Sequence, residues 1–162
     1  MIMLLIRSGN GIIISNTCVV IELRRSYGGL VMTFAVRYFS RSGNTKKIAE
    51  AIAEELGTVA VSVDSSDAAL NEKVDVLFVG GALYAYGIDK KLTAYLKNLD
   101  ASKVGKVAAF STAMLSAHAN DVIKKHARAK GINVQDETFF CKSKEVDSSV
   151  GKAKEFAKAS VK

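Results

Sequence analysis

The hydrophobic residues of this chain fall into short apolar runs and helical repeats that alternate along the sequence. Residues 34–39 are largely apolar, β-branched and aromatic, and the run breaks at Ser40, which is typical of a strand buried in a parallel sheet. After a polar interval, Ile48, Ile52 and Leu56 recur at helical spacing. The pattern therefore predicts a strand, a tight loop and a helix that packs one face onto the sheet.

The same alternation continues along the chain and predicts an α/β fold. Apolar runs bounded by turn residues indicate four further strands, and a helix is expected after each of them. The predicted strands are 59–63, 74–80, 104–110 and 132–141. The predicted helices are a short one at 68–70, one at about 119–130 that ends at Gly131, and one at 149–160. A further helix, with Asp89 as its cap, contains Leu92, Tyr95, Leu96 and Leu99. Right-handed crossovers then give a three-layer α/β/α sandwich with a five-stranded parallel sheet of order 2-1-3-4-5.

Residues 1–32 precede this pattern as an N-terminal extension, and residues 33–162 form the main domain. The extension reads as β-rich, and its apolar runs, which suggest a β-meander, are 2–6, 11–15 and 17–23. Charged residues such as Arg7 interrupt these runs, so we expect no stable membrane insertion. The other interpretation is that the protein begins at Met32, which leads directly into the first strand. Both interpretations stay open, and neither adds candidate chemistry.

The composition is that of a single globular domain and excludes several classes of protein. With 49% hydrophobic and 24% charged residues and no proline, the chain shows no sign of a Pro-rich linker. The net charge of +7 comes from scattered lysines without a nucleic-acid-binding motif, so we expect no nucleic-acid partner. Cys18 and Cys141 lack metal-binding spacing and nothing in the sequence suggests secretion, which predicts reduced thiols in a cytoplasmic protein. Cys141 follows two phenylalanines, which predicts a core position.

The loop between the first strand and its helix carries the strongest signal for ligand binding. This loop consists of Ser40, Arg41, Ser42, Gly43, Asn44 and Thr45. It contains three hydroxyl groups, one amide and one glycine that lets the backbone turn. The free N–H groups and the positive dipole end of the helix point into this loop, which suits a phosphate dianion. The alternative is a polar turn whose hydroxyls only cap the helix.

Two further loops follow predicted strands at the same edge of the sheet. Residues 81–87 follow the third strand and contain small residues and two tyrosines, and residues 111–116 follow the fourth strand and are small and polar. In doubly wound sheets, ligands bind at the carboxyl ends of the strands, where the strand order reverses. We therefore expect these loops to form one site with the loop at 40–45.

The strand, the S-x-S-G-N-T loop and the following helix resemble the phosphate loop of flavodoxins, and the resemblance covers about residues 33–158. It implies non-covalently bound flavin mononucleotide (FMN) as the cofactor. It also implies phosphate contacts from the side chains of Ser40, Ser42, Asn44 and Thr45 and from the backbone of Arg41 and Gly43. The residues that it places along the isoalloxazine ring are Ala82, Tyr84, Tyr86 and Gly87 on one side and Ser111, Thr112, Ala113 and Met114 on the other.

Two departures from the family pattern bear on the expected redox chemistry. Flavodoxins commonly present an aromatic ring from the loop after the fourth strand, whereas 111–116 contains none, which implies a short-chain type with a more open flavin. Carboxylates usually surround the flavin and lower its reduction potential, whereas 81–88 and 111–119 contain no acid. We therefore expect a less negative reduction potential than that of acidic flavodoxins, and an acidic or neutral partner surface.

Three functions from different classes are compatible with the resemblance. The first is a flavodoxin-like electron carrier that serves a redox partner protein. The second is an FMN-dependent oxidoreductase with a small quinone-like acceptor, of the quinone reductase or menaquinone-dependent protoporphyrinogen oxidase type. The third is a flavin-free binding module on the same fold. No catalytic residue or metal site is predicted, His118 and His126 are expected on a helix surface, and the oligomeric state stays open.

Overall fold

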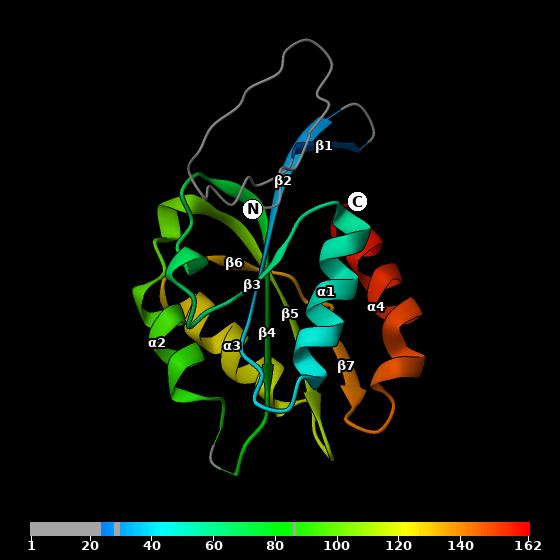
Figure 1. Ribbon diagram of the computed structural model, residues 1–162. Helices are drawn as coiled ribbons and strands as arrows, with labels where there is room; N and C mark the ends of the chain where they lie inside the picture. Colours follow the sequence, from blue (N-terminus) through cyan, green and yellow to red (C-terminus); the bar gives the residue numbers. More distant parts are fainter. Residues whose placement is uncertain (1–23, 28–29, 86) are drawn as a thin grey trace.

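The computed structural model describes residues 24–27, 30–85 and 87–162, which are organised around a central β-sheet (Figure 1). Its parallel strands are β2 (Leu30–Tyr38), β3 (Ala60–Ser62), β4 (Val74–Ala82), β5 (Val104–Ala113), β6 (Asn133–Val134) and β7 (Phe139–Lys142). β3 pairs with β2, β2 with β4, β4 with β5, and β5 with both β6 and β7. With β6 and β7 taken together as the fifth strand, this arrangement confirms the predicted order 2-1-3-4-5.

An additional strand extends the sheet at its N-terminal end. β1 (Arg24–Tyr27) is antiparallel to the beginning of β2, with Arg24 opposite Thr33. We predicted that the strand would begin at residue 34, whereas β2 begins at Leu30 because β1 provides backbone partners for its first residues. The apolar runs of the predicted β-meander lie outside the described residues.

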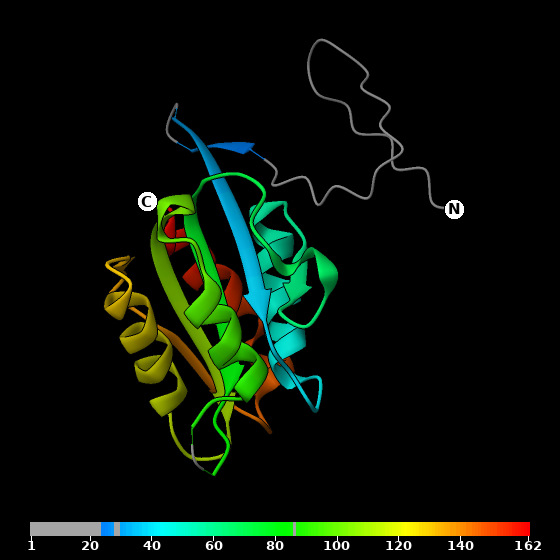
Figure 2. The same cartoon turned by 90° about the vertical axis from the view of Figure 1, so that its left-hand side faces the viewer.

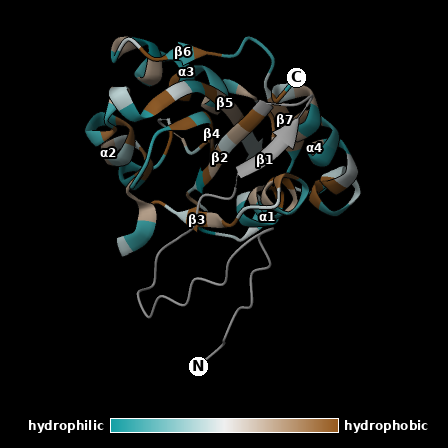
Figure 3. Cartoon of the chain, turned by 90° about the horizontal axis from the view of Figure 1, so that it is seen from above, coloured by the Kyte–Doolittle hydropathy of each residue, from teal (hydrophilic) through white to brown (hydrophobic). Residues whose placement is uncertain are grey.

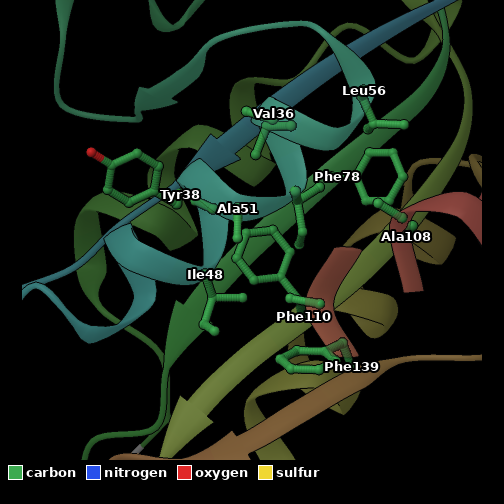
Figure 4. Close-up of a cluster of buried hydrophobic side chains, with 14 of the residues drawn as sticks. Val36, Tyr38, Ile48, Ala51, Leu56, Phe78, Ala108, Phe110 and Phe139 are labelled. Atoms are coloured by element: carbon green, nitrogen blue, oxygen red, sulfur yellow. The ribbon is translucent and has the colours of Figure 1, made fainter. Parts of the chain in front are cut away.

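Helices cover both faces of the sheet, as the view in Figure 3 shows. α1 (Asn44–Leu56) and α4 (Val146–Ser160) lie on one face, and α2 (Lys90–Asn98) and α3 (His118–Ala129) lie on the other. Strand residues therefore divide between two cores: Val36, Phe78 and Phe110 pack with α1 and α4 (Figure 4), whereas Leu77 and Val107 pack with α2 and α3. Burial on both faces explains why the strands read as apolar runs. The predicted three-layer sandwich is confirmed.

The two helix ends that were predicted from Asp89 and Gly131 agree with the structure, whereas α4 begins three residues before the predicted position 149. Asp89 caps α2 by accepting a hydrogen bond from the backbone N–H of Lys91. Gly131 follows α3 with a φ of 75°, the left-handed conformation expected beyond a helix C-terminus. Cys141 is buried in β7, as predicted. In the described part of the chain, no helix is long and apolar enough to cross a bilayer.

The fifth strand is interrupted, which corrects the prediction of one continuous strand over 132–141. Val134 of β6 is opposite Val107 of β5, and Phe139 of β7 is opposite Phe110. Between these two pairs the chain advances five positions (134 to 139), whereas β5 advances three (107 to 110). Two residues in this interval therefore have no opposite residue in β5. The interval includes the exposed acidic residues 136–137.

The connection from β3 to β4 contains a 3₁₀ helix, η1 (Ser66–Ala68), instead of the short helix predicted at 68–70. The carbonyl of Ala68 accepts a hydrogen bond of 2.7 Å from Nε of Arg37, a β2 residue that is only 1% exposed. This bond attaches the connection to the sheet. A groove of about 660 Å³ lies between this connection and α2. A second 3₁₀ helix, η2 (Ala101–Lys103), precedes β5.

Candidate functional site

The three loops predicted to bind a ligand meet at one edge of the sheet, which is the lower edge in Figures 1 and 2. The carboxyl ends of β2, β4 and β5 form this edge. From here the chain enters α1 on one face of the sheet, and α2 and α3 on the other face. The edge therefore contains the reversal of strand order at which doubly wound proteins bind ligands.

The loop after β2 leaves the first turn of α1 open. Gly43 is the N-cap residue, and its φ of 88° is a left-handed conformation that favours glycine. Its N–H donates a hydrogen bond of 3.0 Å to the hydroxyl of Ser40, which closes the turn. No described side chain accepts a hydrogen bond from the first turn of α1. The first N–H groups of the helix are thus left for an external acceptor such as an anion.

Side chains of this loop differ in accessibility. Ser42 is exposed, and Ser40 and Asn44 are half-buried, so these three can present hydroxyl and amide groups to a ligand. Thr45 is fully buried, and its hydroxyl forms a 2.7 Å hydrogen bond with the hydroxyl of Thr112. In this structure the Thr45 hydroxyl therefore joins α1 to β5, and its contact with a phosphate stays a prediction.

The end of β5 differs from the sequence prediction. We expected a loop from residue 111, whereas β5 continues to Ala113 because both β4 and β7 supply backbone partners there. Ser111 is completely inaccessible and Thr112 is 2% exposed, so a ligand could reach them only if the strand end opened. The Ser111 hydroxyl has no hydrogen-bond partner among the described residues. Met114, which is 68% exposed, is the first residue beyond the strand.

The loop after β4 is a tight hairpin. Tyr84 and Gly87 exchange two backbone hydrogen bonds of 2.8 and 3.0 Å, and Gly87 has a φ of 127° that favours glycine. Ala82 ends β4, and Tyr84 is half-buried at the edge. Tyr86 lies outside the described residues. The hairpin thus brings Tyr84 and Gly87 to the expected edge, and their contact with a cofactor stays a prediction.

The side chain of Arg41 links the loop after β2 to the residues after β4. Its Nε donates a hydrogen bond of 3.0 Å to a carboxylate oxygen of Asp89, and a terminal nitrogen contacts the same oxygen. Its guanidinium carbon lies 4.1 Å from the centre of the Tyr84 ring, which is a cation–π contact. Sequence reasoning missed this link, because 48 positions separate Arg41 from Asp89 and no motif spans them.

The carboxylate of Asp89 is held from two sides. Its second oxygen accepts a 2.8 Å hydrogen bond from the backbone N–H of Lys91. Burial alone would raise the pKa of Asp89, but this N–H and the Arg41 guanidinium outweigh burial and keep the pKa below its usual range. Burial raises the pKa of Tyr84, so its phenol stays neutral near pH 7. This edge of the sheet therefore contains an ion pair in which the positive charge of Arg41 offsets the negative charge of Asp89.

A cavity of about 440 Å³ lies beside the hairpin, between it and α3. Tyr84 lines it from the hairpin, and His118, Val122 and His126 line it from α3, where they are spaced at one face of the helix. His118 is exposed and His126 is half-buried, in keeping with the expected helix surface. The larger groove beside η1 is lined by none of the predicted site residues.

Comparisons with known proteins agree with this fold. A flavodoxin from the domain Archaea has a TM-score of 0.67 and 23% identity, with 76% of this chain and 92% of that chain covered. Flavodoxin 1 from Bacillus cereus has a TM-score of 0.60 and 19% identity, with 77% and 97% covered. A flavodoxin, WrbA-like protein from Agrobacterium tumefaciens has a TM-score of 0.61 and 16% identity, with 78% and 95% covered.

A search among curated protein sequences gave no significant match. A family model described as a flavodoxin domain matches residues 35–144, which is well over half of the chain. This stretch includes all three loops of the candidate site. The chain therefore belongs to the flavodoxin family.

Proposed function

We propose that this protein is an FMN-binding electron carrier of the flavodoxin type. The observation that carries the proposal is the uncapped N-terminus of α1, where Gly43 turns the backbone and leaves helix N–H groups open. Ser42 and Asn44 add accessible hydroxyl and amide groups beside it. This donor set fits a phosphate dianion, which FMN carries and riboflavin lacks.

When bound, FMN would supply the one- and two-electron chemistry, and the residues of this chain would hold and orient it. The N–H groups of the first turn of α1 and the side chains of Ser40, Ser42 and Asn44 would bind the phosphate. Tyr84 and Gly87 would lie along the ring from the hairpin side, and Met114 from the side of β5. An acidic or neutral redox protein would exchange the electrons, and a cytoplasmic location is part of the proposal.

The test is a titration of purified protein with FMN, followed by the quenching of flavin fluorescence, with riboflavin as the phosphate-free competitor. We expect FMN to bind much more tightly than riboflavin. Ser42→Ala and Asn44→Ala should each weaken FMN binding and leave riboflavin binding nearly unchanged. Ser102→Ala, which removes a serine at the opposite edge of the sheet, is the matched control and should bind FMN like the wild type.

The outcome of this titration separates the classes of function. Equal binding of FMN and riboflavin would contradict a phosphate site in the loop. A protein that binds no flavin would instead be a binding module on a flavodoxin fold, and the redox proposal would be wrong.

The cavity beside the hairpin favours a second candidate, an FMN-dependent oxidoreductase that acts on a small quinone-like acceptor. Its volume of about 440 Å³ and its position against Tyr84 would admit a small ring next to the proposed flavin. Val122→Trp would narrow the cavity. Turnover of NAD(P)H with a quinone would support this candidate if this substitution slowed turnover and left FMN affinity intact. Val59→Trp is the control, because Val59 is exposed and does not line this cavity.

A further inference from the structure

The ion pair of Arg41 and Asp89 places two opposite charges between the loops that are proposed to hold FMN, so this inference rests on the proposed function. Arg41 belongs to the loop after β2, and Asp89 caps α2. Arg41 also stacks on Tyr84, the ring proposed to lie along the flavin. A flavin that is bound by the first loop and lies along Tyr84 would therefore have this pair as a neighbour.

Asp89 determines where this pair lies. Its carboxylate is only 7% exposed, and the N–H of Lys91 holds the oxygen that Arg41 does not contact. The ammonium group of Lys91 points elsewhere and forms a 3.0 Å ion pair with Asp64. Among the described residues, Arg41 is therefore the cation that contacts the Asp89 carboxylate, although the Arg41 side chain is itself 62% exposed.

We propose that Arg41, by compensating the carboxylate of Asp89, sets the reduction potential of FMN bound at this edge. Reduction adds negative charge to a flavin ring, so a nearby carboxylate disfavours it and a nearby guanidinium favours it. Asp89 is the one acidic residue between positions 81 and 89. Pairing with Arg41 removes the net charge that Asp89 would otherwise bring to the site.

The experiment is a charge cycle in which Arg41→Gln, Asp89→Asn and the double variant are compared with the wild type. Asparagine still accepts the hydrogen bond from Lys91, so the cap of α2 is preserved. For each protein, the FMN dissociation constant is measured first, and a spectroscopic redox titration of the bound FMN follows. The ratio of the dissociation constants of reduced and oxidised FMN follows from these two measurements.

We expect Arg41→Gln to lower the reduction potential and Asp89→Asn to raise it. Each single variant leaves one uncompensated charge in a partly solvated site. The ratio of the dissociation constants of reduced and oxidised FMN should therefore change about threefold to tenfold, in opposite directions for the two single variants. The double variant, which has no charge at either position, should return close to the wild-type potential. A purely structural role of the pair would shift both single variants in the same direction, because both would loosen the same loops.

The failure of this inference can be distinguished from the failure of the proposed function. If all four proteins bind FMN but the single variants shift together or do not shift, the role of the pair is overturned and the flavin proposal stands. If the wild type binds no FMN, the first measurement overturns both.

Discussion

The hydroxyl oxygens of Thr45 and Thr112 lie 2.7 Å apart, where the first turn of α1 meets the end of β5. Both residues are buried, and 67 positions separate them in the sequence. Each was predicted to contact the cofactor. In the structure the two hydroxyls form a hydrogen bond with each other and join α1 to β5, and their contacts with a cofactor stay predictions.

Replacing Thr45 by alanine should therefore destabilise the protein. The substitution leaves the buried Thr112 hydroxyl without its partner, which costs about 1–3 kcal/mol of the free energy of unfolding. Thr45→Ser retains the hydroxyl and should keep most of the stability. Urea unfolding of the three proteins measures the difference. A Thr45→Ala variant with wild-type stability but weakened FMN binding would mean that this hydroxyl serves the ligand.

Gly43→Ala should destabilise the protein through the backbone alone. A Cβ at this position meets no atom within 4 Å, but the φ of 88° costs about 1–2 kcal/mol for a residue with a side chain. Gly151→Ala is the control, because Gly151 lies in the interior of α4 with open space around it. There alanine should raise stability by about 0.5–1 kcal/mol. Thermal unfolding should move in opposite directions for the two variants, and a shared direction would refute the strain at Gly43.

Gly80 gives a prediction about packing within the core. A Cβ on Gly80 would come within 2.0 Å of the Phe110 ring, so Gly80→Ala should cost about 1–3 kcal/mol. In a Phe110→Leu background the same substitution should cost less, because the clashing ring is absent. Urea unfolding of the four proteins in this cycle measures the coupling. Strictly additive effects would show that the ring moves aside freely.

The lowered pKa of Asp89 predicts that the stability of the protein depends on pH. Its pKa is lowered in the folded protein, so the stabilisation is present above the unfolded value of about 3.9 and is lost as the pH falls through the folded value. The difference in unfolding free energy between the wild type and Asp89→Asn should be constant from about pH 5 to 7 and decrease below about pH 4. Unfolding measured at several pH values tests this, and a difference that is unaffected by acid would rule out the linkage.

Several features of the fold follow from the sequence because they depend on local pattern. A strand covered on both faces consists mostly of apolar residues, which made β2, β4 and β5 recognisable as members of a parallel sheet. The loop at 40–45 and its glycine were recognisable for the same reason, since a polar turn between a buried strand and an amphipathic helix is a local signal. Asp89 and Gly131 marked helix ends through chemistry confined to one turn.

By itself, the sequence determined the layers, the order of the main strands and the place of the loop at 40–45 between β2 and α1. The tertiary structure alone decided that β5 continues through Ser111 and Thr112, that the fifth strand divides, and that Arg41 reaches Asp89. The physical reason is the same in each case. Strand ends and ion pairs depend on partners supplied by distant segments, and neither apolar periodicity nor turn chemistry records which partners those will be.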